Sequence, residues 1–91
     1  MTPDAIAAAL AALPAWTSDG RRIAREFRFP DFDATMAFVN AVAAIARRQD
    51  HHPDMEVGYS RVLVTYTSHD VGGLSPRDFA AAAAVDGIPR P

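Results

Sequence analysis

The spacing of the apolar residues changes along the chain, and this change restricts the fold more than any other feature of the sequence. From residue 31 or 33 to about residue 48, one stripe at helical spacing is formed by Phe38, Val39, Val42, Ile45 and Ala46. Between residues 61 and 67 the apolar side chains instead alternate with the period of a β-strand. The chain therefore requires both a long helix and a sheet.

An extended segment lies on each side of Asp19-Gly20, a dipeptide typical of two-residue hairpin turns. These segments are predicted strands at residues 16–18 and 22–29. Ile23, Phe27 and Phe29 fall on one face of the second strand, but Arg25 interrupts that face. The pattern predicts a first hairpin whose inner face contains an unexplained charge.

A second hairpin is predicted from strands at residues 54–57 and 61–67, joined by a turn at residues 58–60. Further helices are predicted at residues 3–12 and from Ser75-Pro76 to about Val85. The resulting order is α-β-β-α-β-β-α, without repeated βαβ units. We therefore expect an α+β fold, with a four-stranded antiparallel sheet and helices packed on one face, in a single domain spanning residues 1–91.

The composition excludes several kinds of chemistry. There is no cysteine, and all nine basic residues are arginine, so the chain has no thiol nucleophile, disulfide or Schiff-base lysine. The net charge is −2 and the arginines are scattered, which argues against direct nucleic-acid binding. The longest apolar run, residues 5–13, is too short for a membrane span, and no secretory signal precedes it. We expect a cytoplasmic protein.

Two adjacent histidines, His51 and His52, directly follow the long predicted helix. The free carbonyl groups of the helix end, together with Asp50 and Asp54, should favour a protonated imidazole there. The pair could therefore exchange protons with a substrate. The alternative is that both residues only cap the helix on a solvated turn.

A metal site is a second alternative for the histidines. His51, His52 and His69 with Asp54 or Asp70 could supply a zinc ligand set. Adjacent side chains seldom converge on one ion, however, and neither an HxH nor an HExxH motif is present. We therefore expect no metal.

Two further candidates lie near the end of the chain. His69 follows the last predicted strand, where loops often carry functional side chains. Asp78 lies three residues after Ser75, and this spacing matches a capping box in which the acid accepts from the amide of the capping residue. Asp78 is thus expected to have a structural role whether or not it also takes part in catalysis.

The stretches "DHHPDMEVGY" and "VLVTYTSHDVGGLSPRDF" together resemble the pterin-4a-carbinolamine dehydratase family. That family has His-His-Pro, an aromatic residue six positions later, a histidine ten further on, and a GL(S/T)xxD helix start. The matching residues in this chain are His51-His52-Pro53, Tyr59, His69 and Gly73-Leu74-Ser75 with Asp78. The earlier "FPDFDATMAFVNAVAAIA" segment and the first hairpin also look like family elements, so the resemblance covers nearly the whole chain.

Two positions depart from the family pattern. The family usually has an acidic residue four positions before the histidine pair, where this chain has Arg47. Asp50 could take over the role of that acid. The position after "HHPD" is often bulky or aromatic in the family and is Met55 here, which could alter the shape of the pocket.

The resemblance implies a hydro-lyase that dehydrates 4a-hydroxytetrahydropterin to quinonoid dihydropterin, by histidine acid–base catalysis and without any cofactor. This reaction recycles tetrahydropterin after an aromatic amino acid hydroxylase in the same pathway. The resemblance implies four catalytic residues: His51, His52, His69 and Asp78. The implied substrate-binding residues are His51, His52, Pro53, Ser68, His69, Asp70 and Val71. We expect the imidazoles to lie at an accessible mouth.

Partners other than the pterin are also implied. Relatives associate through sheet edges and helices, so a homodimer or homotetramer is expected, and the alanine-rich helix up to residue 48 would permit close approach of a second copy. Some family members instead act as dimerisation partners of a transcription factor. A non-catalytic interaction or assembly module of the same fold therefore remains the alternative function.

Overall fold

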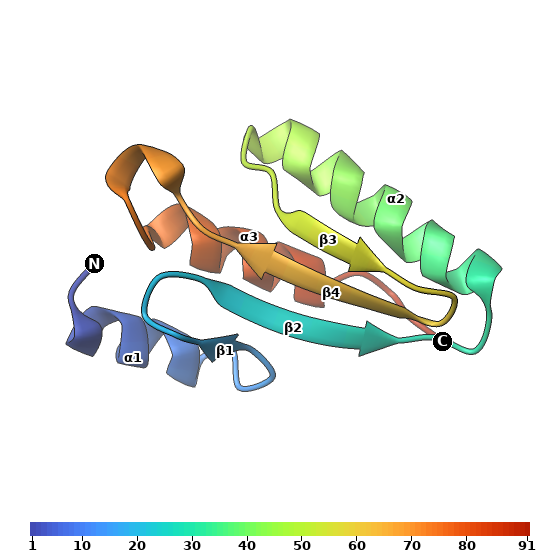
Figure 1. The fold of residues 1–91 in the computed structure, drawn as a ribbon, viewed down its shortest axis with the longest axis horizontal. Helices are drawn as coiled ribbons and strands as arrows, with labels where there is room; N and C mark the ends of the chain where they lie inside the picture. The colour runs from blue at the N-terminus through green and yellow to red at the C-terminus, as the bar shows by residue number, and fades with distance from the viewer.

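The computed structural model describes all residues from Met1 to Pro91 as three α-helices and one four-stranded sheet (Figure 1). In chain order the elements are α1 (Pro3–Ala11), β1 (Thr17–Ser18), β2 (Ile23–Arg28), α2 (Phe32–Gln49), β3 (Asp54–Val57), β4 (Arg61–Tyr66), the 3-10 helix η1 (His69–Val71) and α3 (Pro76–Asp86). The predicted order α-β-β-α-β-β-α is confirmed, and the helix bounds differ from the predicted ones by at most one residue.

The strands are arranged in the order β1-β2-β4-β3, and every neighbouring pair is antiparallel. The central pair, β2 and β4, is in register from Ile23 opposite Tyr66 to Arg28 opposite Arg61. Both predicted hairpins are present, and the strand that follows each helix forms an edge of the sheet. Since Ile23 is opposite Tyr66, the start of β2 lies next to the end of β4, close to the loop that carries η1.

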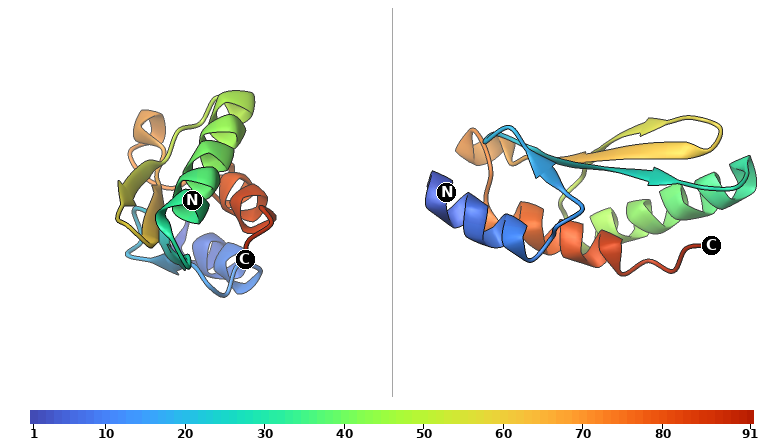
Figure 2. Two further views of the ribbon diagram at one scale, coloured as in Figure 1. Left: turned by 90° about the vertical axis from the view of Figure 1, so that its right-hand side faces the viewer. Right: turned by 90° about the horizontal axis from the view of Figure 1, so that it is seen from below.

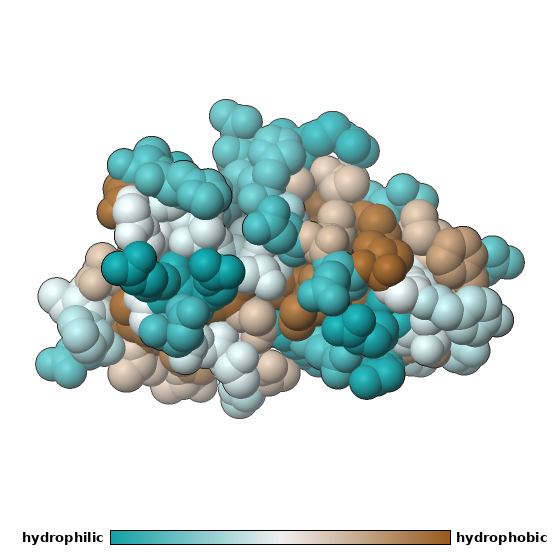
Figure 3. Space-filling view, viewed as in Figure 1, coloured by the Kyte–Doolittle hydropathy of each residue, from teal (hydrophilic) through white to brown (hydrophobic).

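All three helices lie on one side of the sheet, and its other face is uncovered (Figure 2). The core consists of 16 buried apolar residues, which come mainly from the inner face of β2 and β4, from α2 and α3, and from the segment that joins α1 to β1. The uncovered face carries many hydrophilic side chains, and apolar side chains gather near the end of β3 (Figure 3). This one-sided burial is what the alternating pattern of the strands requires. None of the helices combines the length and the hydrophobicity needed to cross a bilayer.

The end of α2 determines where the histidine pair points. Asp50 follows the helix in the left-handed conformation, with φ of 50°, and its N–H donates to the carbonyl of Ala46. The N–H of His51 also donates to Ala46, at 3.2 Å. Asp50, and not the histidine pair, therefore terminates the helix, and the chain turns so that His51 is directed into the protein.

The loop of the first hairpin is longer than predicted. Thr17 pairs with Ala24 and Ser18 with Ile23, so residues 19–22 all lie in the connection, and the prediction of a two-residue turn is wrong. The physical reason is that the carboxylate of Asp19 accepts hydrogen bonds from two successive backbone N–H groups, at 2.9 and 3.0 Å. This Asx-type turn places the two arginines that follow Gly20 in the loop and not in β2.

Arg25, which interrupts the inner face of β2, has a partner at the far end of the chain. Its guanidinium donates to Asp86 Oδ1 at 2.7 Å, and the indole N–H of Trp16 donates to the same oxygen at 2.8 Å. The charged group also lies 4.4 Å from the centre of the Phe27 ring. The arginine therefore ties the sheet to the end of α3 at the edge of the core.

Asp86→Ala should lower the free energy of unfolding by about 1–3 kcal/mol, because both Arg25 and Trp16 would lose their acceptor in a partly buried position. Urea unfolding followed by tryptophan fluorescence measures this loss. Glu56→Ala is the matched control, since that side chain is 72% exposed and approaches Arg61 only to 4.0 Å. An equal change in the two variants would contradict the structural role of Asp86.

Candidate active site

His51 and Asp78 form a buried contact between the end of α2 and the first turn of α3. The distance from Nε2 of His51 to Oδ1 of Asp78 is 2.6 Å, and the side chain of Asp78 is completely buried. Because an ionised carboxylate can only accept, Nε2 is the donor and carries a proton. The contact joins residues that are 27 positions apart in the sequence.

The second oxygen of Asp78 receives two further hydrogen bonds. The hydroxyl of Ser68 and the backbone N–H of Ser75 each donate to Oδ2 at 2.9 Å. The two serine hydroxyls are 2.7 Å apart, and since Ser68 uses its hydrogen toward Asp78, Ser75 donates to Ser68. A continuous chain of hydrogen bonds therefore fixes the orientation of the carboxylate.

This arrangement gives Asp78 two roles at once. Ser75 is the N-cap of α3, and Asp78 at the third helical position accepts from the amide of Ser75, as the capping-box spacing predicts. The other oxygen of the same carboxylate holds His51. The sequence predicted the cap and left a further role of Asp78 open, and one carboxylate makes both contacts because it has two oxygens.

Tyr66 covers one face of the His51 imidazole, a position that the sequence did not indicate. The two rings are stacked with centres 5.6 Å apart and planes inclined by 19°. The phenol is fully buried, and its hydroxyl is the one buried side-chain polar atom without a hydrogen-bond partner. Burial, and then the charge of Asp78, raises the pKa of Tyr66 to about 12, so the phenol stays neutral at physiological pH.

The other ring nitrogen of His51 is left open. Nδ1 makes no hydrogen bond within the protein, and it is not among the enclosed atoms that lack a partner. It therefore reaches solvent, although only 9% of the residue is exposed. The expectation that all three imidazoles lie at an accessible mouth is thus wrong for His51, because the turn after α2 directs it inward.

The remaining predicted residues lie nearer the surface. His52 and His69 are exposed, Pro53 is half-buried, and Val71 is 60% exposed. Asp70 binds the guanidinium of Arg77 at 2.5 Å, and this hydrogen bond lowers the pKa of the Asp70 carboxyl. Of the seven predicted substrate-binding residues, the structure joins only Ser68 and His51 through a shared partner, Asp78.

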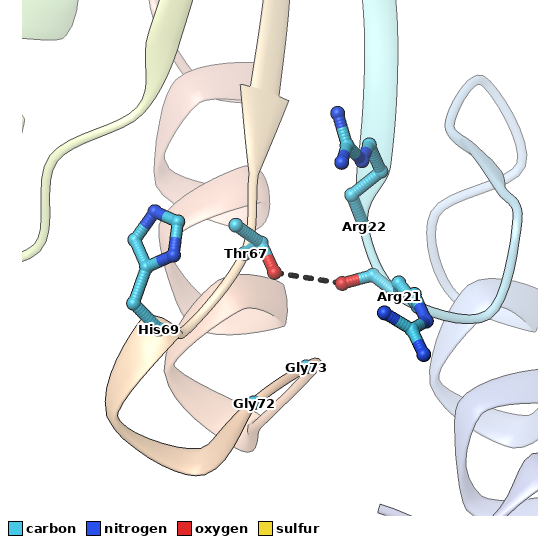
Figure 4. A pocket seen from close by; sticks show the side chains of 6 residues that line it. All are labelled: Arg21, Arg22, Thr67, His69, Gly72 and Gly73. Carbon is cyan, nitrogen blue, oxygen red and sulfur yellow. Dashed lines mark hydrogen bonds between the residues drawn. The ribbon is translucent and has the colours of Figure 1, made fainter.

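A polar pocket of about 240 Å³ opens beside η1, and His69 is the one histidine that lines it. Figure 4 shows His69 on one side of Thr67 and two guanidinium groups on the other. The lining residues are Arg21, Arg22, Thr67, His69, Gly72 and Gly73. Sequence reasoning missed the two arginines, although their position directly after the predicted turn placed them at the start of β2.

The structure groups no three His, Asp or Glu side chains in a way that could hold a metal ion. His51 is engaged by Asp78, whereas His52 and His69 are exposed on different segments. The alternative zinc set of the three histidines with Asp54 or Asp70 is therefore not assembled in this structure.

A model of the family "Pterin 4 alpha carbinolamine dehydratase" matches residues 1–88 of the chain. The chain belongs to this family of hydro-lyases. A relative from Xanthomonas oryzae pv. oryzae, named after pterin-4-alpha-carbinolamine dehydratase, is 54% identical over 80 residues, which are 86% of this chain and 68% of the relative. A relative of the same name from Stenotrophomonas maltophilia is 49% identical over 85 residues, or 91% of this chain and 73% of the relative.

Two solved structures show the same architecture. The transcriptional coactivator/pterin dehydratase from Brucella melitensis superposes with a TM-score of 0.89 over 94% of both chains, at 35% identity. A pterin dehydratase-like protein identified as a RuBisCO assembly factor in the alpha-carboxysome gives a TM-score of 0.65 at 25% identity, over 78% of this chain and 82% of that one. The resemblance inferred from the sequence is confirmed.

Neither position that departs from the family pattern makes a hydrogen bond or an ion pair with His51 or Asp78. Arg47 is exposed on the last turn of α2, and Met55 is half-buried and packs against the core from β3. The aromatic Tyr59 is 69% exposed and stacks on Phe32. The expected substitute for the missing acid, Asp50, caps α2, and Asp78 is the carboxylate that contacts the histidine.

Tyr66→Phe should raise the free energy of unfolding by about 1–3 kcal/mol, because it removes a buried hydroxyl that lacks a partner. Tyr59→Phe, at an exposed phenol, should change stability by less than about 0.5 kcal/mol. Urea unfolding of both variants measures the difference. A loss of stability in Tyr66→Phe would show that the hydroxyl has a partner.

The pH dependence gives the same variant a second readout. The pKa of Tyr66 is about 12 in the folded protein and near 10.0 in the unfolded chain. Between these values the folded state binds more protons, so the stability contribution of the neutral phenol is lost as the pH rises through this window. In Tyr66→Phe, the free energy of unfolding should not show this decrease at alkaline pH.

Proposed function

We propose that the protein converts 4a-hydroxytetrahydropterin into quinonoid dihydropterin and water. The hydroxyl group on C4a takes up a proton and leaves as water, the N5 lone pair forms the C4a=N5 double bond, and N5 loses its proton to a base. One proton donor and one proton acceptor are sufficient for this reaction, and imidazoles can fill both roles near pH 7. Membership of the family supports the assignment.

The buried contact between His51 and Asp78 is the observation that carries the proposal. Asp78 accepts from Nε2, so only Nδ1 of His51 is free to exchange a proton with the substrate. When His51 takes up a proton there, the adjacent carboxylate stabilises the imidazolium, as it does in other pairs of histidine and carboxylate. Asp78 acts through His51 and is in this sense a positioning residue.

His69 is proposed as the second proton-transfer group. It is exposed and lines the pocket beside η1, so a substrate in that pocket would contact its ring. We propose that His52 and Pro53 orient the pterin ring from the loop after α2. Backbone groups of Ser68, Asp70 and Val71 would contact the pterin from the loop after β4.

The proposal also places the protein in a reaction sequence. The carbinolamine arises when an aromatic amino acid hydroxylase oxidises tetrahydropterin, so such an enzyme would supply the substrate. No metal or organic cofactor takes part in the proposed steps. We further propose that the protein associates as a homodimer or homotetramer, as the alanine-rich surface of α2 favours close approach of helices.

His51→Ala and His69→Ala should each lower kcat/KM by about 10²–10⁴-fold, the usual effect of losing a general acid or base. Asp78→Asn should lower kcat mainly, because the amide no longer stabilises an imidazolium, and it should shift the pH profile of the remaining activity. Stopped-flow absorbance of carbinolamine dehydration measures these rates after subtraction of the spontaneous reaction.

Asp50→Asn is the matched control for Asp78→Asn. Asp50 neighbours His51 in sequence but caps α2, and asparagine tolerates its left-handed conformation, so turnover should be unchanged. Equal losses in the two variants would contradict the role of Asp78. If the wild-type protein does not exceed the spontaneous rate, the dehydratase proposal fails, and the role as an interaction or assembly module becomes the better explanation.

A further inference from the structure

The pocket beside η1 has an unusual lining for a site that would take a neutral ring. None of its six lining residues is hydrophobic, and none is acidic. Its charged groups are the guanidinium groups of Arg21 and Arg22, which Figure 4 shows across Thr67 from His69. A concave surface with two cations and no carboxylate favours an anionic ligand.

The two guanidinium groups are only weakly engaged within the protein. Arg22 forms one long ion pair with Asp19, 3.8 Å from Nε to Oδ2, between side chains that are 59% and 62% exposed, and Arg21 makes no ion pair. The other oxygen of Asp19, Oδ1, accepts from the backbone N–H groups of both arginines. By contrast, ion pairs within 3.3 Å engage Arg25, Arg28, Arg61 and Arg77. Neither guanidinium group of the pocket makes a hydrogen bond within the protein, so both can donate to a ligand.

The loop that carries the arginines is held against the loop that carries His69. The hydroxyl of Thr67 donates to the backbone carbonyl of Arg21 at 2.7 Å (Figure 4). On the opposite wall, the N–H groups of Val71, Gly72 and Gly73 all donate to carbonyls within the loop. The donors that these two walls offer to a ligand are therefore mainly the side chains of Arg21, Arg22 and His69.

Pterin chemistry connects these arginines to the proposed reaction. C4a, N5 and C6 are consecutive ring atoms, so the first atom of a substituent on C6 is two bonds away from the nitrogen that loses its proton. If His69 serves C4a or N5, that substituent lies against the same pocket. We propose that Arg21 and Arg22 bind a phosphate group carried by the C6 side chain of the pterin, an inference that rests on the proposed function.

A phosphate monoester fits this pocket better than an uncharged side chain. Guanidinium groups donate in pairs to phosphate oxygens, and the positive charges of the two arginines balance the nearly two negative charges of the ester. Because both arginines are exposed, the attraction is screened by salt. The preference for the phosphorylated pterin should therefore fall as the ionic strength rises.

The test compares two stable oxidised pterins, 6-hydroxymethylpterin and its phosphate monoester, by fluorescence titration of the full-length protein. The phosphate ester should bind at least about tenfold more tightly at low salt. In the double variant Arg21→Gln/Arg22→Gln this preference should fall below about twofold, while the affinity for the alcohol stays within about twofold of wild type. Arg28→Gln, at the other end of β2 and paired with Glu26, is the matched control and should keep the preference.

Equal binding of the two pterins by the wild type, or a preference that survives in the double variant, would overturn the phosphate subsite. Competition by inorganic phosphate against the ester but not against the alcohol would support it. Dehydration of a carbinolamine with an uncharged side chain is measured in parallel. Turnover without any phosphate preference would refute the subsite alone, whereas absence of both turnover and pterin binding would refute the proposed function as well.

Discussion

The hydrogen bond between His51 and Asp78 is the interaction on which the candidate site depends. Burying a carboxylate costs free energy unless donors surround it, and here the donors come from the end of α2, the loop after β4 and the start of α3. These segments must be correctly packed before Asp78 is satisfied. The same carboxylate also caps α3, so the packing of the fold and the position of His51 are specified together.

The two histidines of the proposed proton transfer have different surroundings. His51 is enclosed between a carboxylate and the Tyr66 ring, whereas His69 lies exposed on η1 beside two arginines. Groups of one chemical type in different environments can act as acid and base in one reaction. The buried His51 and the exposed His69 can therefore have different roles in the proton transfer. In the proposed complex, the exposed side with the two arginines also binds the anionic side chain of the substrate.

The sequence predicted the fold well because the periodicity of a helix or a strand is local. Each element can be recognised from the residues of its own segment. The sequence predicted His51 and Asp78 as candidates but not their contact, since 27 positions separate them and the nearer Asp50 and Asp54 appeared to be the partners. The charge at Arg25 is explained only by Asp86, on another element. The stacking of Tyr66 on His51 and the pocket with its two arginines likewise depend on tertiary packing, which cannot be inferred from the periodicity of the sequence.

The most direct test of the account is the protonation state of the His51 ring, measured by imidazole ¹⁵N–¹H NMR. The account predicts that Nε2 of His51 carries a proton and donates it to Asp78, and that Asp78→Asn alters this signal but leaves those of His52 and His69 unchanged. A His51 ring protonated only on Nδ1, or a His51 signal that Asp78→Asn does not alter, would contradict it.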